Sequence, residues 1–200
     1  MMRPYRNAIS GHCHRVELLL NVLGINYEPV EVDLRAGAQK SAEFLALNPF
    51  GQIPVLQDGD LVLADSNAIL VYIARNYDAS GRWLPNDPVG AAQVQRWLSV
   101  AAGPLAYGPA TSRRICLFKS AQDLVSAQGI ATGLLRVLDT ALSSEPYLTG
   151  KSPTIADLAM YAYTARAPEG EIDLVPYPKV NDWLHEIEGL PGFIPMLQSR

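Results

Sequence analysis

Four side chains that can carry chemistry lie within five residues near the N-terminus: Ser10, His12, Cys13 and His14. The apolar residues that follow them repeat at helical spacing, so the group sits at the start of a predicted helix. A hydroxyl there can donate a hydrogen bond to an anion that also meets the positive end of the helix. A cysteine in a first helical turn can have a lowered pKa and act as a nucleophile. The simpler interpretations are a helix cap for Ser10 and a small, half-buried packing residue for Cys13.

The segment His12-Cys13-His14 contains ligand types that zinc accepts, but its spacing does not suit a metal. Protein metal sites usually need three or four ligands, and residues two apart on a helix point in different directions. The remaining histidine, His185, is far along the chain, and Cys116 has no partner near it in the sequence. We therefore expect no metal site and an inert Cys116.

A second predicted helix start carries polar side chains at Asp65 and Ser66. Backbone N–H groups at a helix start bind carboxylates, and the hydroxyl of Ser66 adds one more donor. Simple N-capping is also sufficient to explain both residues. The pair is therefore a candidate anion site, and the residues around it decide between anion binding and simple capping.

The elements that must hold these groups follow one another as β-α-β-α-β-β-α over the first eighty residues. Apolar spacing and the hairpin signal Asp58-Gly59 predict them. Gly24 is the expected C-terminal stop of the first helix, and Pro29 suggests an edge position for the second strand. This order is typical of a small α/β sheet layered with helices. The expected strands are 3–9, 27–32, 55–57 and 61–64, and the expected helices begin near Ser10, Ser41 and Asp65 or Ser66.

A change of composition divides the chain after residue 78. Residues 79–87 are rich in Gly, Ser, Asn, Asp and Pro, as is usual in a linker between domains. The rest of the chain, 88–200, has helical spacing and contains the capping-box pattern Thr154-Ile155-Ala156-Asp157. The sequence thus predicts an α/β domain over 1–78, a linker over 79–87 and an all-helical domain over 88–200.

Composition excludes several classes of protein. Hydrophobic residues make up 48% of the chain, enough for a core without disulfides. The net charge of −4 does not suit a nucleic-acid binder, and the apolar runs are too short for a membrane span. Two cysteines form no disulfide framework, and the polar N-terminus is unlike a signal peptide. We expect a cytoplasmic protein that binds neither nucleic acid nor membrane.

Four segments in order resemble the cytosolic glutathione transferases: ISGHCHRVELLLNVLGI, LNPFGQIPVL, LADSNAIL and TIADL. The resemblance covers nearly the whole chain and crosses the predicted domain boundary where the family has one. It implies a thioredoxin-like N-terminal domain followed by a helical bundle. Among subfamilies, the chain looks most like the serine-type enzymes (theta, phi and zeta) and related bacterial forms.

The resemblance implies roles for residues in the first domain. Ser10 matches the serine whose hydroxyl donates to the sulfur of glutathione, which has to be held as a thiolate. The bond Ile53-Pro54 matches a proline that is cis in the family, where the preceding residue pairs with the peptide backbone of glutathione. Ser66 would bind the γ-glutamyl carboxylate, and Asp65 would meet the ammonium group or orient the turn.

The glycine carboxylate of glutathione is expected at the opposite end of the site, at Gln39, Lys40 and Gln52. The electrophilic second substrate would bind between the domains, in the region of Tyr107, Arg113 and Arg114. His12 departs from the commonest serine-type loops, and its ring could touch the sulfur or the second substrate.

The predicted function is conjugation of glutathione to a small hydrophobic electrophile, without a metal. One alternative is a glutathione-dependent disulfide reductase or lyase that acts through Cys13, as some bacterial relatives do. Another is a binding or regulatory module that kept the fold and lost catalysis, although the presence of Ser10 and Ser66 argues against it. The family usually forms homodimers, so we also expect a homodimer.

Overall fold

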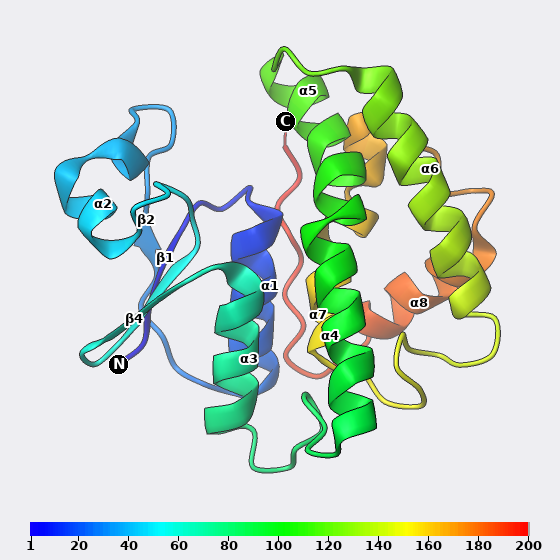
Figure 1. Cartoon of the computed structure of the whole chain (residues 1–200), viewed down its shortest axis with the longest axis horizontal. Coiled ribbons are helices and arrows are strands. Elements are labelled where there is room, and N and C mark those ends of the chain that lie inside the picture. The colour runs from blue at the N-terminus through cyan, green and yellow to red at the C-terminus, as the bar shows by residue number, and fades with distance from the viewer. Residues whose placement is uncertain (200) are drawn as a thin grey trace.

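The computed structural model describes residues 1–199. Its first part has the predicted order of strands and helices, which confirms the α/β class (Figure 1). The elements are β1 (Arg3–Arg6), α1 (Gly11–Val22), β2 (Val30–Glu31), α2 (Ala42–Leu47), β3 (Val55–Asp58), β4 (Leu61–Ala64) and α3 (Ser66–Tyr77), with a short 3-10 turn η1 (Ala38–Lys40) before α2.

The four strands form one sheet in the order β2-β1-β3-β4. Strand β1 runs parallel to β2 and antiparallel to β3, and β3 and β4 form the hairpin that Asp58-Gly59 predicts. Strand β2 lies at the edge, as Pro29 indicates, because proline cannot donate to a second neighbour. It is shorter than the predicted 27–32, and β1 ends at Arg6 rather than at residue 9. The residues after Arg6 instead turn toward the first helix.

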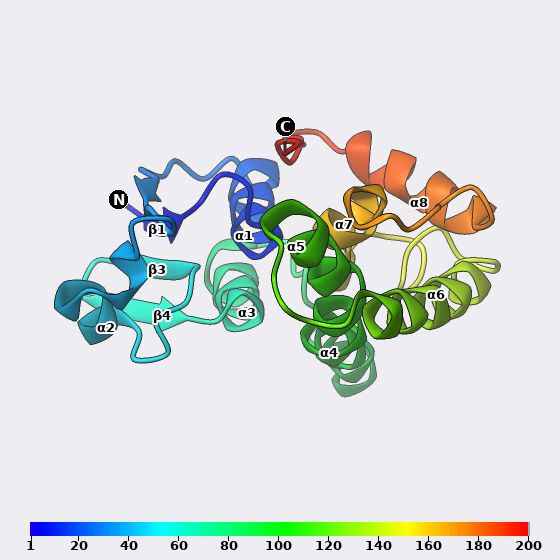
Figure 2. The same cartoon turned by 90° about the horizontal axis from the view of Figure 1, so that it is seen from above.

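Helices α1 and α3 cover one face of the sheet, and α2 lies on its other side (Figure 2). Helix α1 ends where Gly24 adopts a φ of 65°, and the N–H of Ile25 bonds back to Leu20. That left-handed conformation suits glycine, which lacks a Cβ. The predicted stop at Gly24 is therefore confirmed.

The second part of the chain is helical, as predicted. It contains α4 (Pro88–Ala102), the π-turn η2 (Ala106–Ala110), α5 (Thr111–Phe118), α6 (Leu124–Ala141), α7 (Ile155–Ala165), the 3-10 turn η3 (Ala167–Gly170) and α8 (Pro178–Glu188). Every strand of the sheet lies before residue 65 in the described chain. No helix of residues 1–199 combines the length and apolarity needed to cross a membrane.

Helix α7 occupies the centre of the second part and packs against α1 and α4. Nearly all of its residues are buried. One apolar core therefore runs from Leu19 and Leu20 of α1 to Leu158 and Met160 of α7 without a break between the two parts. Burial on this scale is the main favourable term in folding, and here both halves of the chain share it.

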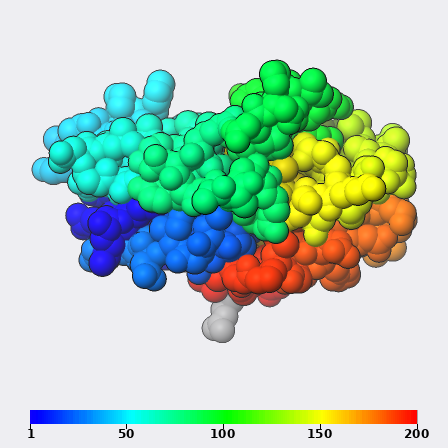
Figure 3. All heavy atoms as spheres, turned by 90° about the horizontal axis from the view of Figure 1, so that it is seen from below, coloured from blue at the N-terminus to red at the C-terminus, as the bar shows by residue number. Residues whose placement is uncertain are grey.

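Residues 193–199 run as an extended tail between α1 and the helical part, and Figure 3 shows the C-terminal residues (red) against the N-terminal part (blue). The ring of His14 lies 2.8 Å from the carbonyl oxygen of Ile194, measured from Nε2. The ring of Phe193 packs edge-on against Tyr161 of α7. The tail thus contacts both parts of the protein at once.

The predicted capping box at the start of α7 is present. Thr154 is the N-cap, and the side chain of Asp157 accepts from the N–H of Thr154. The same carboxylate, which is fully buried, also accepts from the N–H of Leu148 at 2.9 Å and from the indole of Trp183 at 3.0 Å. It therefore links three segments of the helical part.

We expect Asp157→Ala to lower the free energy of unfolding by about 3 kcal/mol or more, because it leaves several buried donors without an acceptor. Urea unfolding at pH 7 measures this loss. Asp123 is the matched control: it caps α6 in the same way but at the surface, where water can replace it. An equally small loss in Asp157→Ala and Asp123→Ala contradicts the assigned role.

Candidate active site

One edge of the sheet brings together three of the predicted site segments. Tyr5 and Ala64 both pair with Val55, so the end of β1, the start of β3 and the end of β4 lie side by side. The chain leaves β1 there toward Ser10, enters β3 through Ile53-Pro54 and leaves β4 toward Asp65. The peptide bond before Pro54 is cis, as predicted.

Ser10 is the N-cap of α1 in extended conformation, and its Oγ accepts from the N–H of Cys13 at 3.3 Å. The hydroxyl proton is not used by that bond, because the oxygen acts as the acceptor. The residue is partly exposed. Its backbone N–H bonds to Asn7, which closes the loop ahead of the helix. Ser10 thus has a proton to donate at the positive end of α1.

Arg113 holds this loop from the helical part of the chain. Its Nη1 donates to the carbonyl of Ile9 at 2.9 Å, its Nε to Glu169 at 2.6 Å and its Nη2 to Ser199 at 2.8 Å. The side chain is buried, and the geometry disagrees with the predicted role in lining an open pocket. Arg113 instead braces the residue just before Ser10.

Cys13 is almost completely buried, at 1% exposure. Burial raises the pKa of its thiol to about 12 and outweighs the lowering effects of Ser10, Asn7 and Arg6. The predicted alternative of a lowered pKa at the helix start is therefore wrong. At this buried position no water solvates a thiolate.

His12 faces the start of α3. Its Nδ1 lies 3.5 Å from the Oγ of Ser66, and its ring packs edge-on against Tyr163 of α7 at a centroid distance of 5.0 Å. Burial, followed by the charges of Arg15 and Arg114, lowers the pKa of His12 to about 3. The imidazole is therefore neutral at pH 7.

Asp65 is the N-cap of α3, and its Oδ1 accepts from the N–H groups of Asn67 and Ala68, both at 2.9 Å. Its φ of 73° is unusual for a residue with a side chain. Such a conformation costs about 1–3 kcal/mol and is often found at functional sites. The turn directs Ser66 inward, where it is buried next to His12.

Lys40 lies against the loop that leads into β3, with its Nζ 3.3 Å from the carbonyl of Phe50. A Cβ at Gly51 would come within 2.7 Å of that Nζ, and the φ of Gly51 is 59°, so glycine fits here for two reasons. The loop also contains Gln52, whose carbonyl accepts from Asn48. The structure therefore brings Lys40 and Gln52 into one region, beside Gln39.

Tyr107 is 65% exposed on η2, and Arg114 is exposed on α5, where it donates to Gln122 at 2.8 Å. The charge of Arg114 acts on His12, so this part of α5 faces the site. The role of these two residues toward a second substrate stays a prediction.

Three residues of the site escaped the sequence analysis: Arg15, Asn67 and Tyr163. Arg15 is buried and donates to both Ser66 and Asn67. In the sequence, Arg15 is recognisable as a cation among the apolar residues of α1. Helical spacing alone does not reveal that α7 covers the side of α1 that carries it. Within residues 1–199, no cluster of three His, Cys, Asp or Glu side chains could hold a metal.

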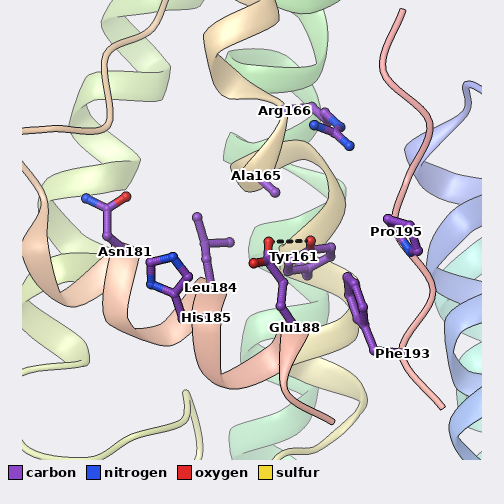
Figure 4. Close-up of a pocket in the computed structure, with 9 residues that line it drawn as sticks. All are labelled: Tyr161, Ala165, Arg166, Asn181, Leu184, His185, Glu188, Phe193 and Pro195. Carbon is purple, nitrogen blue, oxygen red and sulfur yellow. Dashed lines mark hydrogen bonds between the residues drawn. The ribbon is translucent and has the colours of Figure 1, made fainter. Parts of the chain in front are cut away.

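A separate hollow of about 330 Å³ lies between α7, α8 and the tail (Figure 4). The hydroxyl of Tyr161 donates to Glu188 across it at 2.9 Å, and Arg166 and Phe193 stand at its sides. None of the predicted site residues lines it. It is therefore distinct from the site at the sheet edge.

Comparison with known proteins identifies the family. Residues 5–75 match the model of the glutathione S-transferase N-terminal domain, and residues 96–191 match that of the C-terminal domain. Glutathione S-transferase 3 of Zea mays is 36% identical over 96% of this chain and 91% of its own length. A crystal structure of glutathione S-transferase from Pseudomonas fluorescens superposes with a TM-score of 0.93, at 34% identity, over 98% of this chain and 99% of that one.

The chain belongs to the glutathione S-transferase family and is a transferase that uses glutathione. A further relative, a glutathione transferase homolog of Drosophila mojavensis, was crystallised with bound glutathione. It shares 28% identity with this chain at a TM-score of 0.84, over 96% of this chain and 90% of its own. The resemblance drawn from the four sequence segments is confirmed at the level of the family.

Two histidines, the half-buried His12 and the buried His14, make stability depend on pH. The pKa of His12 is lowered to about 3 and that of His14 to about 4, mainly by burial. Between pH 6.5 and these values the unfolded chain binds more protons than the folded one, so stability falls as pH falls. Between pH 7 and pH 4.5, we expect the free energy of unfolding to fall by up to about 2–3 kcal/mol less in His12→Gln than in the unmodified protein. Urea unfolding over this pH range tests it, and an unchanged acid loss in the variant contradicts it.

The two cysteines should differ in reactivity. We expect iodoacetamide to alkylate the partly exposed Cys116 at least about tenfold faster than the buried Cys13 in the native protein at pH 8. Peptide mass spectrometry after timed labelling gives both rates, and labelling in urea provides the control in which both react. Comparable native rates are the outcome at odds with the burial of Cys13.

Proposed function

We propose that this transferase conjugates the thiolate of glutathione to small hydrophobic electrophiles, with the hydroxyl of Ser10 hydrogen-bonded to the sulfur. The observation that carries the proposal is the position of Ser10: it caps α1 while retaining a hydroxyl proton, on a loop braced by Arg113. A free thiol with a pKa near 8.5 is mostly protonated at pH 7. A hydroxyl donor and a helix N-terminus both favour the anion.

In this proposal glutathione lies along the sheet edge. Its cysteine backbone pairs with Ile53 ahead of the cis Pro54, its γ-glutamyl end meets Asp65 and Ser66, and its glycine carboxylate meets Lys40 with Gln39 and Gln52. The proximity of Lys40 to the loop of Gln52 supports the last assignment. The relative with bound glutathione supports the ligand itself. No metal takes part in this mechanism.

The electrophile would sit beside the thiolate against α5, near Tyr107 and Arg114. Neutral His12, packed on Tyr163, separates this region from the γ-glutamyl end. A neutral ring does not repel a cation or attract an anion strongly, so the charges that an electrophile meets there are the thiolate sulfur and Arg114. Such a reaction suits the detoxification of reactive apolar compounds.

Two further expectations belong to this proposal. The exposed side chain of Phe50, at 77%, is apolar surface near the site that a second copy of the chain could cover in a homodimer. The unpaired thiols Cys13 and Cys116 suit a reducing, cytoplasmic environment.

The structure offers less support for a reductase or lyase that acts through Cys13. That chemistry needs an accessible thiolate that can form a mixed disulfide with glutathione. The thiol is buried, and its pKa is raised to about 12. Ser10 is therefore the better candidate to face the sulfur.

We expect Ser10→Ala to lower the conjugation rate at pH 6.5 by about tenfold or more, on the scale of losing one hydrogen bond to a developing anion. The deficit should shrink as pH rises toward 9, because the thiol of glutathione then ionises without help. Rates measured with a chromogenic aryl halide from pH 6 to pH 9 give this profile.

Cys13→Ser is the matched control for Ser10→Ala and should leave the rate nearly unchanged. Mass spectrometry of the protein after incubation with oxidised glutathione checks for an adduct on Cys13. A stable adduct, together with loss of activity in Cys13→Ser alone, overturns the assignment of Ser10 and favours the cysteine mechanism.

A further inference from the structure

Arg15 is a buried cation without a counter-charge in contact. Its side chain is among the largest that are fully buried, at 1% exposure. Its Nη1 donates to the Oγ of Ser66 at 3.3 Å and to the Oδ1 of Asn67 at 2.8 Å. Among the described residues, its Nε and Nη2 have no hydrogen-bond partner, and no carboxylate lies within ion-pair distance of the guanidinium.

The groups around Arg15 do not neutralise it. From α1 it meets His12 and Cys13, and burial holds His12 neutral and keeps the thiol protonated. From α7 it meets Tyr163, whose pKa is raised by burial. The charge of Asp65 also acts on Arg15, but its carboxylate is not within ion-pair distance and already accepts two backbone N–H groups of α3.

An unpaired buried charge is costly, because the protein interior solvates it poorly. The pKa of Arg15 is lowered to about 10 by burial, which still leaves the group charged at pH 7. A cost of this kind is usually offset by a partner. The polar side chain beside it is Ser66, at the start of α3, a helix of 12 residues that Asp65 caps.

Arg15 also decides what Ser66 can do. A guanidinium has donors and no acceptor, so in this contact the Oγ of Ser66 is the acceptor. The proton of Ser66 is therefore free to point to the Nδ1 of His12, at 3.5 Å, or to an incoming anion. Asn67 completes the arrangement: its Oδ1 accepts from Arg15 and its amide donates to Leu98 of α4 at 3.0 Å, so its orientation is fixed.

We propose that Arg15 is a positioning residue for the γ-glutamyl carboxylate of glutathione: it fixes Ser66 as a hydrogen-bond donor and supplies the buried positive charge that the bound carboxylate compensates. This inference rests on the proposed function, in which that carboxylate binds at Ser66. In this proposal the preference of the site for a charged γ-glutamyl end depends on a residue of α1 as well as on the start of α3.

A cycle of two proteins and two ligands tests the proposal. The proteins are the unmodified chain and Arg15→Met, which keeps the length of the side chain and removes the charge. The ligands are glutathione and its analogue with γ-aminobutyryl in place of γ-glutamyl, in which hydrogen replaces the γ-glutamyl carboxylate. The analogue also lacks the stereocentre that carries this carboxylate. The ratio of the two Kd values is therefore compared between the two proteins, because the loss of the stereocentre is the same for both. Isothermal titration calorimetry gives the four Kd values.

We expect Arg15→Met to weaken glutathione binding about tenfold to a hundredfold and to change binding of the analogue by less than about threefold. We also expect the ligand-free variant to melt no lower than the unmodified protein, since removing an unpaired buried charge is often neutral or stabilising. Equal weakening for both ligands, or a clear fall in melting temperature, assigns Arg15 a purely structural role and overturns the proposal.

Arg15→Lys supplies a second test, which separates the charge of the side chain from the geometry of the guanidinium. Lysine retains the charge but cannot donate to Ser66 and Asn67 from one planar group. It should weaken glutathione binding, and again more than binding of the analogue. Failure of the proposed function is a separate result: in that case the unmodified protein binds neither ligand.

Discussion

The packing of α1 between α3 and α7 is the constraint on which the rest of the structure depends. One helix is shared by two hydrophobic surfaces, so the loop at its start is fixed by both halves of the chain. The fit is close at Gly11, where a Cβ would lie 2.8 Å from the ring of Tyr163. Arg113 adds a polar brace from the same side. Ser10 is thus placed by residues more than a hundred positions away.

The same burial sets the electrostatics of the site. It keeps the thiol of Cys13 protonated and the rings of His12 and His14 neutral, while Arg15 remains charged. Burial disfavours the charged form of each of these groups, but a guanidinium keeps its proton at pH 7. The proposed site therefore combines a buried guanidinium with the N-termini of α1 and α3, and the proposed mechanism uses no metal.

Local signals in the sequence predicted the elements, since helix caps, the hairpin at Asp58-Gly59 and the stop at Gly24 depend on nearby residues. They also placed Ser10, Ser66 and the cis Pro54 at element boundaries. The burial of Cys13 and the contacts of Arg113 could not be predicted in this way. Both depend on α7, η3 and the tail, which meet the first domain only in the folded chain, and helical spacing does not reveal which face a distant helix will cover.

The positions of the tryptophans give the shared core a spectroscopic consequence. All three, Trp83, Trp97 and Trp183, follow the α/β part of the chain, and all are buried. Trp97 donates to Leu148 and Trp183 to Asp157, so two of the indoles are anchored in one region of the helical part. Fluorescence excited selectively at tryptophan therefore reports on the chain after the sheet, whereas far-ultraviolet circular dichroism sees the helices of both parts. Because α1 joins the two parts in one core, the two signals should change together as the protein unfolds, and a gap between them would measure how independently the sheet domain can open.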